Sequence, residues 1–297
     1  MSAATDWLSE RLLARVAALG SRELEPARRR TAWLRRLLQL ALRRRRRIVH
    51  RNLELCFPEL DRAARQQLER EHFGQLADAV AEIAYAWHHP GRLDTAIGEV
   101  RGQEHLDTAR EPGHGVLLVT AHCTCLELGA RLFGERFQAR ALYRPLANAR
   151  LDAAQCTGRA RYAEAMIPRH DLRAMLRHLR GGGIVWYAPD QDLGPDRSTF
   201  APFFGIETAT ANAIAELARR SRARVVPMYP LKNPETGRIT VWLEPAWNDF
   251  PSDDRRADLA RYNAFVERRV REHPAQYWWL HRRFKTAPEG EPPRYRN

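Results

Sequence analysis

Short apolar runs alternate with helical repeats of apolar residues between positions 115 and 245. Residues 116–119 (Val-Leu-Leu-Val) and 184–187 (Ile-Val-Trp-Tyr) are uncharged and rich in β-branched or aromatic side chains, as is typical of strands buried on both faces of a parallel sheet. Further strands are predicted at 141–144, 224–227 and 239–242. This alternation predicts an α/β fold, with a mainly parallel central sheet flanked by helices.

Helices are predicted around and between these strands. Asp61 is a plausible N-cap for a helix that ends near residue 87, and Asp171 for one that ends at residue 180 before three glycines. Residues 202–210 predict a turn that leads into a helix over 211–220. The other helices are expected from about Thr124, around Cys156 and Arg159, and over 258–273.

The first 50 residues predict amphipathic helices in which arginine accompanies an apolar side. That side carries Trp7, Leu12, Leu13, Val16 and Leu19, and then Trp33, Leu34, Leu37, Leu38 and Leu40. Basic amphipathic helices with tryptophan suit the plane of an anionic membrane, although ordinary helices packed on a domain give the same pattern. We therefore divide the chain into membrane-associating helices over 1–50 and a main domain over 51–297. No run of about eighteen uncharged apolar residues occurs, so we expect no membrane-spanning helix.

The composition of the chain limits the classes of partner and cofactor that it is expected to bind. The 297 residues carry a net charge of +13, almost entirely from arginine, which favours anionic partners such as nucleic acid, anionic lipid or an acidic carrier protein. Four cysteines are too few for a disulfide framework, and Cys123-Thr-Cys125 lacks the usual zinc spacing. His88-His89 precedes Pro90 and indicates a helix end rather than a metal site. No phosphate-binding or dinucleotide-binding glycine motif is present, so we predict neither metal nor nucleotide cofactor.

The candidate chemistry lies where the strand at 116–119 ends. His122 follows that strand, at the sheet edge where α/β proteins bind ligands, and Glu127 lies five positions later in the next helix. Glu127 could orient the His122 ring for general-base chemistry, or it could simply close a capping box on Thr124, which is the commoner use of this spacing. A Cys123 or Cys125 nucleophile is a weaker alternative, because adjacent residues at a strand end point apart.

Three more polar residues are candidates on similar grounds. Asp190 follows the strand at 184–187, so it is expected at the same crevice, although it could merely form a turn before Gly194. Arg144 and Arg159 could bind phosphate or stabilise an oxyanion, although surface arginines are common in this chain.

Several longer motifs resemble the late acyltransferases of lipid A biosynthesis, within the glycerolipid acyltransferase superfamily. His122 and Glu127 fit the H-x-x-x-x-[D/E] signature of that superfamily. The other matching motifs are VHRNLELCFP (49–58), LELGAR (126–131), YRP (143–145), WYAPD (186–190) and QYWWLHRRFKT (276–286). The series most resembles the lauroyltransferase type that acts on Kdo-lipid IVA.

The resemblance implies that His122 deprotonates a hydroxyl of the lipid A precursor, which attacks the thioester of an acyl carrier protein. Glu127 would orient His122, and Arg159 and Asp190 would also be catalytic, with Arg144 in a substrate-binding motif. Residues 51–297 would then be an acyltransferase domain that needs no cofactor or nucleic acid. Family members usually begin with an uncharged transmembrane stretch, which arginines interrupt here, so we expect peripheral attachment to the cytoplasmic face of the bacterial inner membrane.

Two rival functions stay open at this point. One is an acyltransferase of the same superfamily with a glycerophospholipid or aminolipid acceptor. The other is a non-enzymatic basic protein that binds nucleic acid or membrane through the arginines at 43–47, with steep salt dependence and no need for His122.

Overall fold

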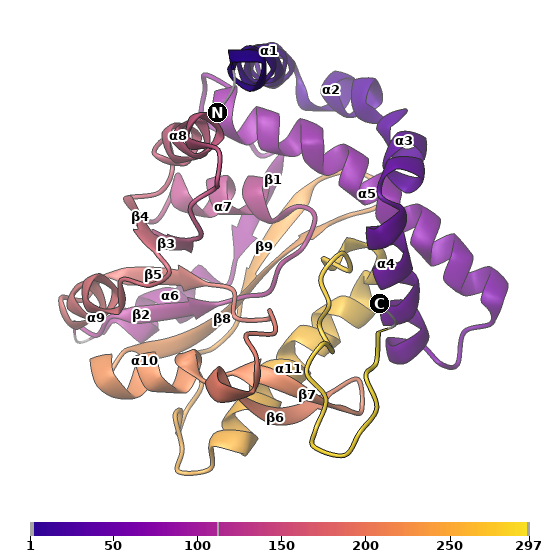
Figure 1. The fold of residues 1–297 in the computed structure, drawn as a ribbon. Helices are drawn as coiled ribbons and strands as arrows, with labels where there is room; N and C mark the ends of the chain where they lie inside the picture. Colours follow the sequence, from indigo (N-terminus) through magenta and orange to yellow (C-terminus); the bar gives the residue numbers. More distant parts are fainter. Residues whose placement is uncertain (1–2, 112, 296–297) are drawn as a thin grey trace.

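The computed structural model describes residues 3–111 and 113–295, and it confirms the α/β fold (Figure 1). Seven strands of the described residues form one sheet in the order β1-β9-β8-β2-β5-β3-β4, in which only the β8–β9 pair is antiparallel. Its strands are β1 (Gly98–Arg101), β2 (Val116–Val119), β3 (Arg140–Tyr143), β4 (Ala165–Pro168), β5 (Ile184–Tyr187), β8 (Arg224–Lys232) and β9 (Ile239–Leu243). All four residues of β2 are buried, as an uncharged central strand requires.

Helices flank this sheet and precede it (Figure 1). They are α1 (Ala3–Gly20), α2 (Leu24–Thr31), α3 (Leu34–Ala41), α4 (Arg43–Cys56), α5 (Arg62–His88), α6 (Gln103–Arg110), α7 (Leu126–Gly134), α8 (Ala149–Arg159), α9 (Leu172–Arg180), α10 (Ala213–Ser221) and α11 (Arg255–Glu272), with short 3-10 turns at Pro195–Arg197 and Pro274–Gln276. The caps predicted for α5 and α9 are confirmed: Asp61 accepts from the amide of Ala64 at 2.7 Å, and Asp171 from that of Ala174 at 2.9 Å.

One local prediction is wrong, and the start of one predicted helix differs. The segment predicted as a turn leading into a helix is the antiparallel hairpin of β6 (Ser198–Phe203) and β7 (Ile206–Ala211). Phe204 and Gly205 turn its corner with positive φ angles of 52° and 72°, and α10 begins only at Ala213. The last helix begins three residues earlier than predicted, because Asp254 caps it at the amide of Ala257. Strands β1 and β4 and helix α6 had not been predicted.

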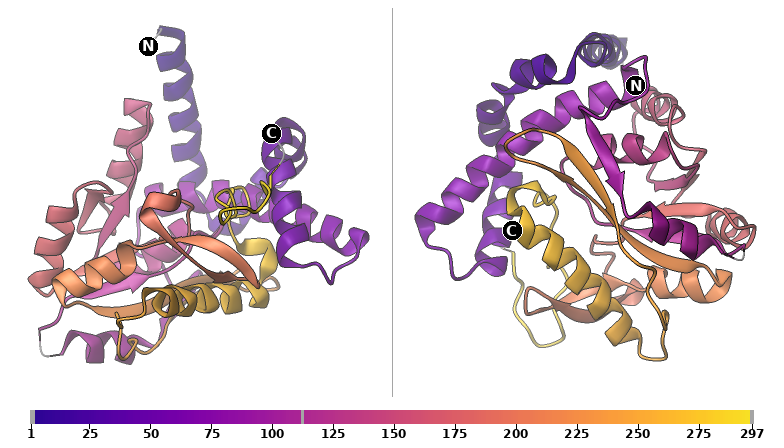
Figure 2. Two further views of the ribbon diagram at one scale, coloured as in Figure 1. Left: turned by 60° about the horizontal axis from the view of Figure 1, so that its bottom comes forward. Right: turned by 180° about the vertical axis from the view of Figure 1, so that it is seen from behind.

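The N-terminal helices are present as predicted, and α1, α2, α3 and α4 all pack against the long helix α5. In Figure 2, α1 extends away from the sheet at the N-terminal end of the chain. Residue 50 lies inside α4, so the backbone shows no break at the predicted boundary. Within the described residues, none of the helices has the length and apolar character needed to cross a membrane.

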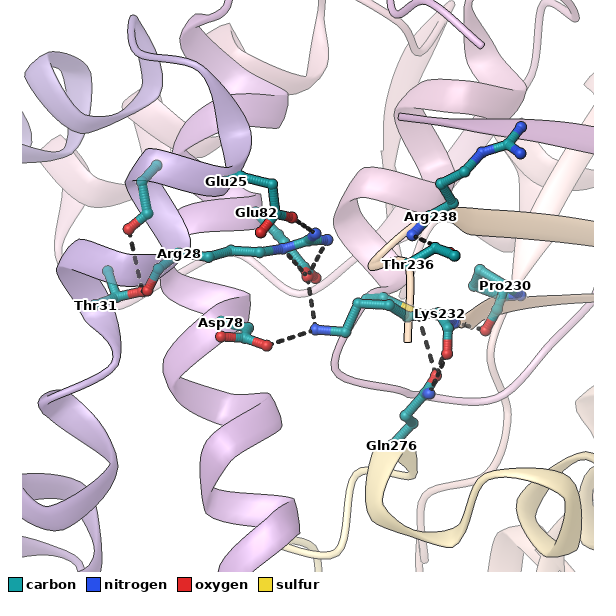
Figure 3. Close-up of polar contacts among 12 residues, drawn as sticks. Glu25, Arg28, Thr31, Asp78, Glu82, Pro230, Lys232, Thr236, Arg238 and Gln276 are labelled. Carbon is teal, nitrogen blue, oxygen red and sulfur yellow. Dashed lines mark hydrogen bonds and ion pairs between the residues drawn. The ribbon is translucent and has the colours of Figure 1, made fainter. Parts of the chain in front are cut away.

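A buried ion cluster joins these helices to the sheet (Figure 3). Glu82 of α5 accepts from Arg28 of α2 at 2.8 Å and from Lys232, at the end of β8, at 2.9 Å. Lys232 also pairs with Asp78 at 2.9 Å, and Arg28 with Glu25 at 2.5 Å. The side chains of Arg28, Glu82 and Lys232 are all buried, so each charge depends on the others for compensation.

Candidate active site

His122 and Asp190 meet because they follow adjacent parallel strands. Val119 at the end of β2 is in register with Tyr187 at the end of β5, so the loops after both strands leave the same sheet edge. Nδ1 of His122 lies 2.5 Å from Oδ1 of Asp190, and the backbone amide of His122 donates to Oδ2 at 3.0 Å. The two contacts fix both the ring and the backbone of His122 against one buried carboxylate.

This pairing sets the charge of both groups. Burial favours neutral imidazole, but the facing Asp190 carboxylate outweighs it and raises the pKa of His122 above its ordinary value. Burial also opposes ionisation of Asp190, yet His122 and, more weakly, Arg283 lower the pKa of Asp190 to about 2. Asp190 is therefore ionised at neutral pH and accepts the Nδ1 proton, which leaves Nε2 as the basic nitrogen.

Glu127 does not contact this pair, and both interpretations of its spacing are wrong. Its carboxylate accepts from Arg159 Nε and Nη2, at 2.7 and 2.6 Å, and from Trp87 Nε1 at 2.8 Å. The Tyr162 hydroxyl also donates to it. The amide of Thr124, which a capping box would engage, donates instead to the Gln276 carbonyl at 2.8 Å. Asp190, which follows the neighbouring strand β5, occupies the position beside His122 that was expected for Glu127. Sequence spacing alone could not predict this arrangement.

Arg159 is held beside the site by its helix and by Glu127. Its predecessor, Gly158, lies so close to Trp87 of α5 that a Cβ there would come within 2.4 Å of the indole ring, so this glycine lets α8 approach α5. Burial disfavours the charged guanidinium, but the Glu127 carboxylate outweighs it and raises the pKa of Arg159. A fixed cation therefore lies in the same crevice as His122.

A cavity of about 260 Å³ opens beside these side chains. His122, Glu127, Arg144 and Arg159 contribute its polar wall, and Arg144 is exposed to solvent. The rest of the wall is mainly apolar and comes from α7, β3, β4 and β5; it includes Leu126, Ala130, Phe133, Leu142, Met166 and Trp186. A basic imidazole, a guanidinium and an apolar pocket thus lie in one crevice, an arrangement that suits a reaction on a long apolar chain.

Comparison with known proteins identifies the family of this chain. A family model described as bacterial lipid A biosynthesis acyltransferase matches residues 1–286. The lipid A biosynthesis lauroyltransferase of Escherichia coli strain K12 is 42% identical over 261 residues, covering 86% of this chain and 85% of the relative. The chain belongs to the lipid A biosynthesis acyltransferase family. It is therefore an acyltransferase, and the alternative of a non-enzymatic basic protein is excluded.

Other members of the family carry different acyl groups in their names. The lipid A biosynthesis palmitoleoyltransferase of the same strain is 37% identical over 251 residues, covering 84% of this chain and 82% of the relative. The lipid A biosynthesis myristoyltransferase is 32% identical over 284 residues, covering 93% and 87%. Family membership thus establishes the reaction class of this acyltransferase without fixing its acyl chain.

Neither Cys123 nor Cys125 lines the crevice. Cys123 and Cys125 lie with their Sγ atoms 3.8 Å apart, and both thiols approach the Pro230 carbonyl, at 3.6 and 3.5 Å. Burial raises the pKa of Cys123 well above its ordinary value, which argues against a thiolate nucleophile. Among the described residues, no cluster of three or more histidine, cysteine, aspartate or glutamate side chains is suited to hold a metal.

Sequence reasoning missed two supports of His122. The C-terminal segment, which we define as residues 276–286, runs beside the loop that carries His122: Trp278 N donates to the His122 carbonyl at 3.1 Å, and Tyr277 forms a β-bridge with Cys123. The side-chain amide nitrogen of Gln191 lies 3.5 Å from Nε2 of His122. The motif at 276–286 was visible in the sequence, but no spacing rule places it next to residue 122.

Proposed function

We propose that the enzyme transfers a fatty acyl chain, lauroyl by resemblance, from an acyl carrier protein to a hydroxyl of the Kdo-lipid IVA precursor. The observation that carries this proposal is the His122 ring, held at Nδ1 by Asp190, beside a largely apolar cavity. The relative with 42% identity is named a lauroyltransferase, which supports the choice of chain.

The geometry supports direct transfer with His122 as general base. Nε2 takes the proton of the acceptor hydroxyl while the oxygen attacks the thioester carbonyl. The tetrahedral intermediate collapses by breaking the carbon–sulfur bond, and the leaving thiolate receives the proton from the imidazolium. The product is an ester on the lipid and a free thiol on the carrier, so the reaction needs no covalent acyl-enzyme, and Asp190 stabilises the imidazolium throughout.

Arg159 has the position and charge to stabilise the developing oxyanion. It lines the same cavity as His122, and its bidentate pair with Glu127 holds it still. A preorganised cation in a pocket that excludes water stabilises a developing negative charge far more strongly than a cation in solution does. Glu127 therefore serves the reaction through Arg159, rather than through His122 as the resemblance had implied.

The surface charge suits two anionic substrates. An acyl carrier protein is acidic, and the acceptor carries phosphate and carboxylate groups, for which arginine provides two parallel hydrogen bonds. Arg144 is exposed at the cavity wall, where it can contact such a group on the acceptor.

We also propose peripheral attachment to the cytoplasmic face of the bacterial inner membrane through α1 and α3. Trp7 and Leu12 on α1, and Trp33 just before α3, are each more than half exposed, as is Leu40 on α3. Large apolar side chains beside many arginines fit the interface of an anionic bilayer.

The decisive experiment is acyl transfer by the purified enzyme, with mass spectrometry of the lipid product. Carrier proteins loaded with chains of different length are offered with Kdo-lipid IVA, and the wild type is expected to add one chain while His122→Ala adds none. Near-normal turnover by His122→Ala would refute the mechanism. Transfer to a glycerophospholipid or aminolipid but not to Kdo-lipid IVA would establish the alternative acceptor.

A further inference from the structure

The proposed mechanism assigns no role to Gln191, although its side chain lies at the basic nitrogen of His122. The amide nitrogen of Gln191 is 3.5 Å from Nε2, while the residue before it, Asp190, holds Nδ1 at 2.5 Å. Two consecutive residues thus face the two nitrogens of one ring. Because Asp190 accepts the Nδ1 proton, Nε2 carries a lone pair, and only a hydrogen-bond donor can face it. The NH₂ end of the Gln191 amide is therefore the end beside Nε2.

Both neighbours of Gln191 in the chain are anchored. Asp190 is bonded to the ring and to the backbone amide of His122. Asp192 accepts from the amide and the hydroxyl of Thr286, at 2.7 and 2.8 Å. Both carboxylates are buried, at 3% and 8% exposure. The backbone that carries the Gln191 amide is therefore fixed before a substrate arrives, as a group that orients a reactant requires.

The amide of Gln191 has hydrogen-bonding capacity to spare. Within the part of the chain that the structure describes, its side chain has no hydrogen bond other than the contact with His122, and it is only partly buried. Gln191 does not line the apolar cavity, whereas His122 and Arg159 do. If the cavity takes the acyl chain, the acceptor hydroxyl reaches Nε2 from outside it. The free amide then lies where the acceptor arrives.

The geometry of proton transfer brings the acceptor oxygen into contact with this amide. A hydroxyl that gives its proton to Nε2 must bring its oxygen to about 2.6 to 3.2 Å from that nitrogen. The oxygen then takes the lone pair that faces Gln191 in the free enzyme, and the displaced amide stays within hydrogen-bond reach of it. One lone pair of the hydroxyl oxygen attacks the thioester, and the second can accept from Gln191.

We propose that Gln191 is a further catalytic residue, whose side-chain amide donates a hydrogen bond to the acceptor hydroxyl and holds its oxygen at Nε2 of His122. This inference rests on the proposed function and names the group that binds the reacting hydroxyl. The competing explanation is that Gln191 only occupies Nε2 in the free enzyme. In that case the acceptor must displace the amide, and its removal would strengthen acceptor binding.

Steady-state kinetics separate the two explanations. Gln191→Met keeps the length of the side chain but cannot donate a hydrogen bond. We expect KM for the acceptor to rise and kcat/KM to fall roughly tenfold, the contribution of one neutral hydrogen bond, while KM for the acyl carrier protein stays the same. An acceptor KM that is unchanged or lower would overturn the proposal. If Gln191→Met proves unstable in urea, Gln191→Asn replaces it, because the shorter side chain withdraws the same amide.

A titration of His122 tests where the Gln191 side chain lies. Gln191→Glu has the same shape but places a carboxylate at Nε2, so it should raise the pKa of His122 by about one pH unit. We would measure this by NMR on enzyme labelled with ¹⁵N in histidine, with the His122 signals assigned from His122→Gln. The other charged or titratable groups that act on His122 stay the same in this variant, namely Asp190, Arg159 and His281. An unchanged pKa would overturn the proposal.

Gln138 provides the matched control for both measurements. It is an exposed glutamine that precedes β3, at the edge of the sheet opposite the crevice, so Gln138→Met and Gln138→Glu should leave the kinetics and the titration unchanged. The titration needs no substrate, so it is independent of the acceptor assay. If the wild type ignores Kdo-lipid IVA, the proposed acceptor is rejected, and the kinetics of Gln191→Met are measured on the lipid that the wild type does acylate.

Discussion

At the scale of single residues, the ring of His122 depends on Asp190. Asp190→Asn removes the charge that raises the pKa of His122, while burial, which lowers it, remains. We expect kcat/KM to fall by about 10²- to 10⁴-fold, which is the usual contribution of a positioned general base to the rate. The acid limb of the pH profile should move to lower pH, because the neutral imidazole then persists further into acid. An acid limb that stays in place or moves upward would contradict this account.

Glu127 and Arg159 should behave as a unit in a double-mutant cycle. Glu127→Ala leaves the partly buried guanidinium unpaired and should cost about 2 kcal/mol in the free energy of unfolding, measured with urea. Adding Arg159→Met removes the stranded charge and should restore most of this stability without restoring acyl transfer. Additive losses of stability would show that the two side chains do not act through each other.

The sequence identified five polar residues at or behind the crevice but not their partners. His122, Glu127, Arg144, Arg159 and Asp190 were named from strand ends and motifs, and the structure places them around or directly behind one cavity. The sequence could not predict that Asp190, rather than Glu127, contacts His122, because Asp190 and His122 are 68 positions apart in the sequence. Spacing rules describe neighbours on one element, whereas this pair depends on which strands lie side by side.

At the scale of elements, uncharged strands and capped helices were predictable and short mixed segments were not. Residues 116–119 and 184–187 were found because burial on both faces excludes polar residues. The hairpin of β6 and β7 was missed because Pro202 and Gly205 resemble a loop, and its register only becomes visible once the strands pair. Strands β1 and β4 are as short as β2 and β5, but they are only partly buried, so burial on both faces does not mark them in the sequence.

The ion cluster between α2, α5 and β8 gives a prediction at this scale. Glu82→Ala would leave Arg28 and Lys232 buried without their shared carboxylate, at a cost of about 3 to 5 kcal/mol. Because its neighbours lower the pKa of Glu82 despite burial, the stabilisation should be fully present above the ordinary glutamate pKa of 4.5 and lost as the pH falls through the lowered pKa. Urea unfolding at several pH values measures both effects. Glu71→Ala on the exposed side of the same helix is the control and should change little.

At the scale of the whole molecule, the exposed apolar residues before α5 should control vesicle binding. Trp33→Ala and Leu40→Ala each remove a large exposed side chain, and each should weaken binding to anionic vesicles by roughly tenfold. Co-sedimentation with vesicles of phosphatidylglycerol measures this. Leu172→Ala, an exposed leucine on α9, is the matched control. Equal binding by all variants would reject α3 as the attachment surface.

The way the C-terminal segment closes over the loop that carries His122 also bears on how the enzyme is made. Every strand of the sheet precedes residue 244, so the scaffold can assemble on the ribosome while residues 276–278 are still unmade. A nascent chain, or one cut short by a stop codon near residue 275, would lack the backbone hydrogen bonds that Gln276 and Trp278 form with the loop carrying His122. We therefore expect the loop that carries His122 to gain its full set of backbone contacts only after residues 276–278 have been made.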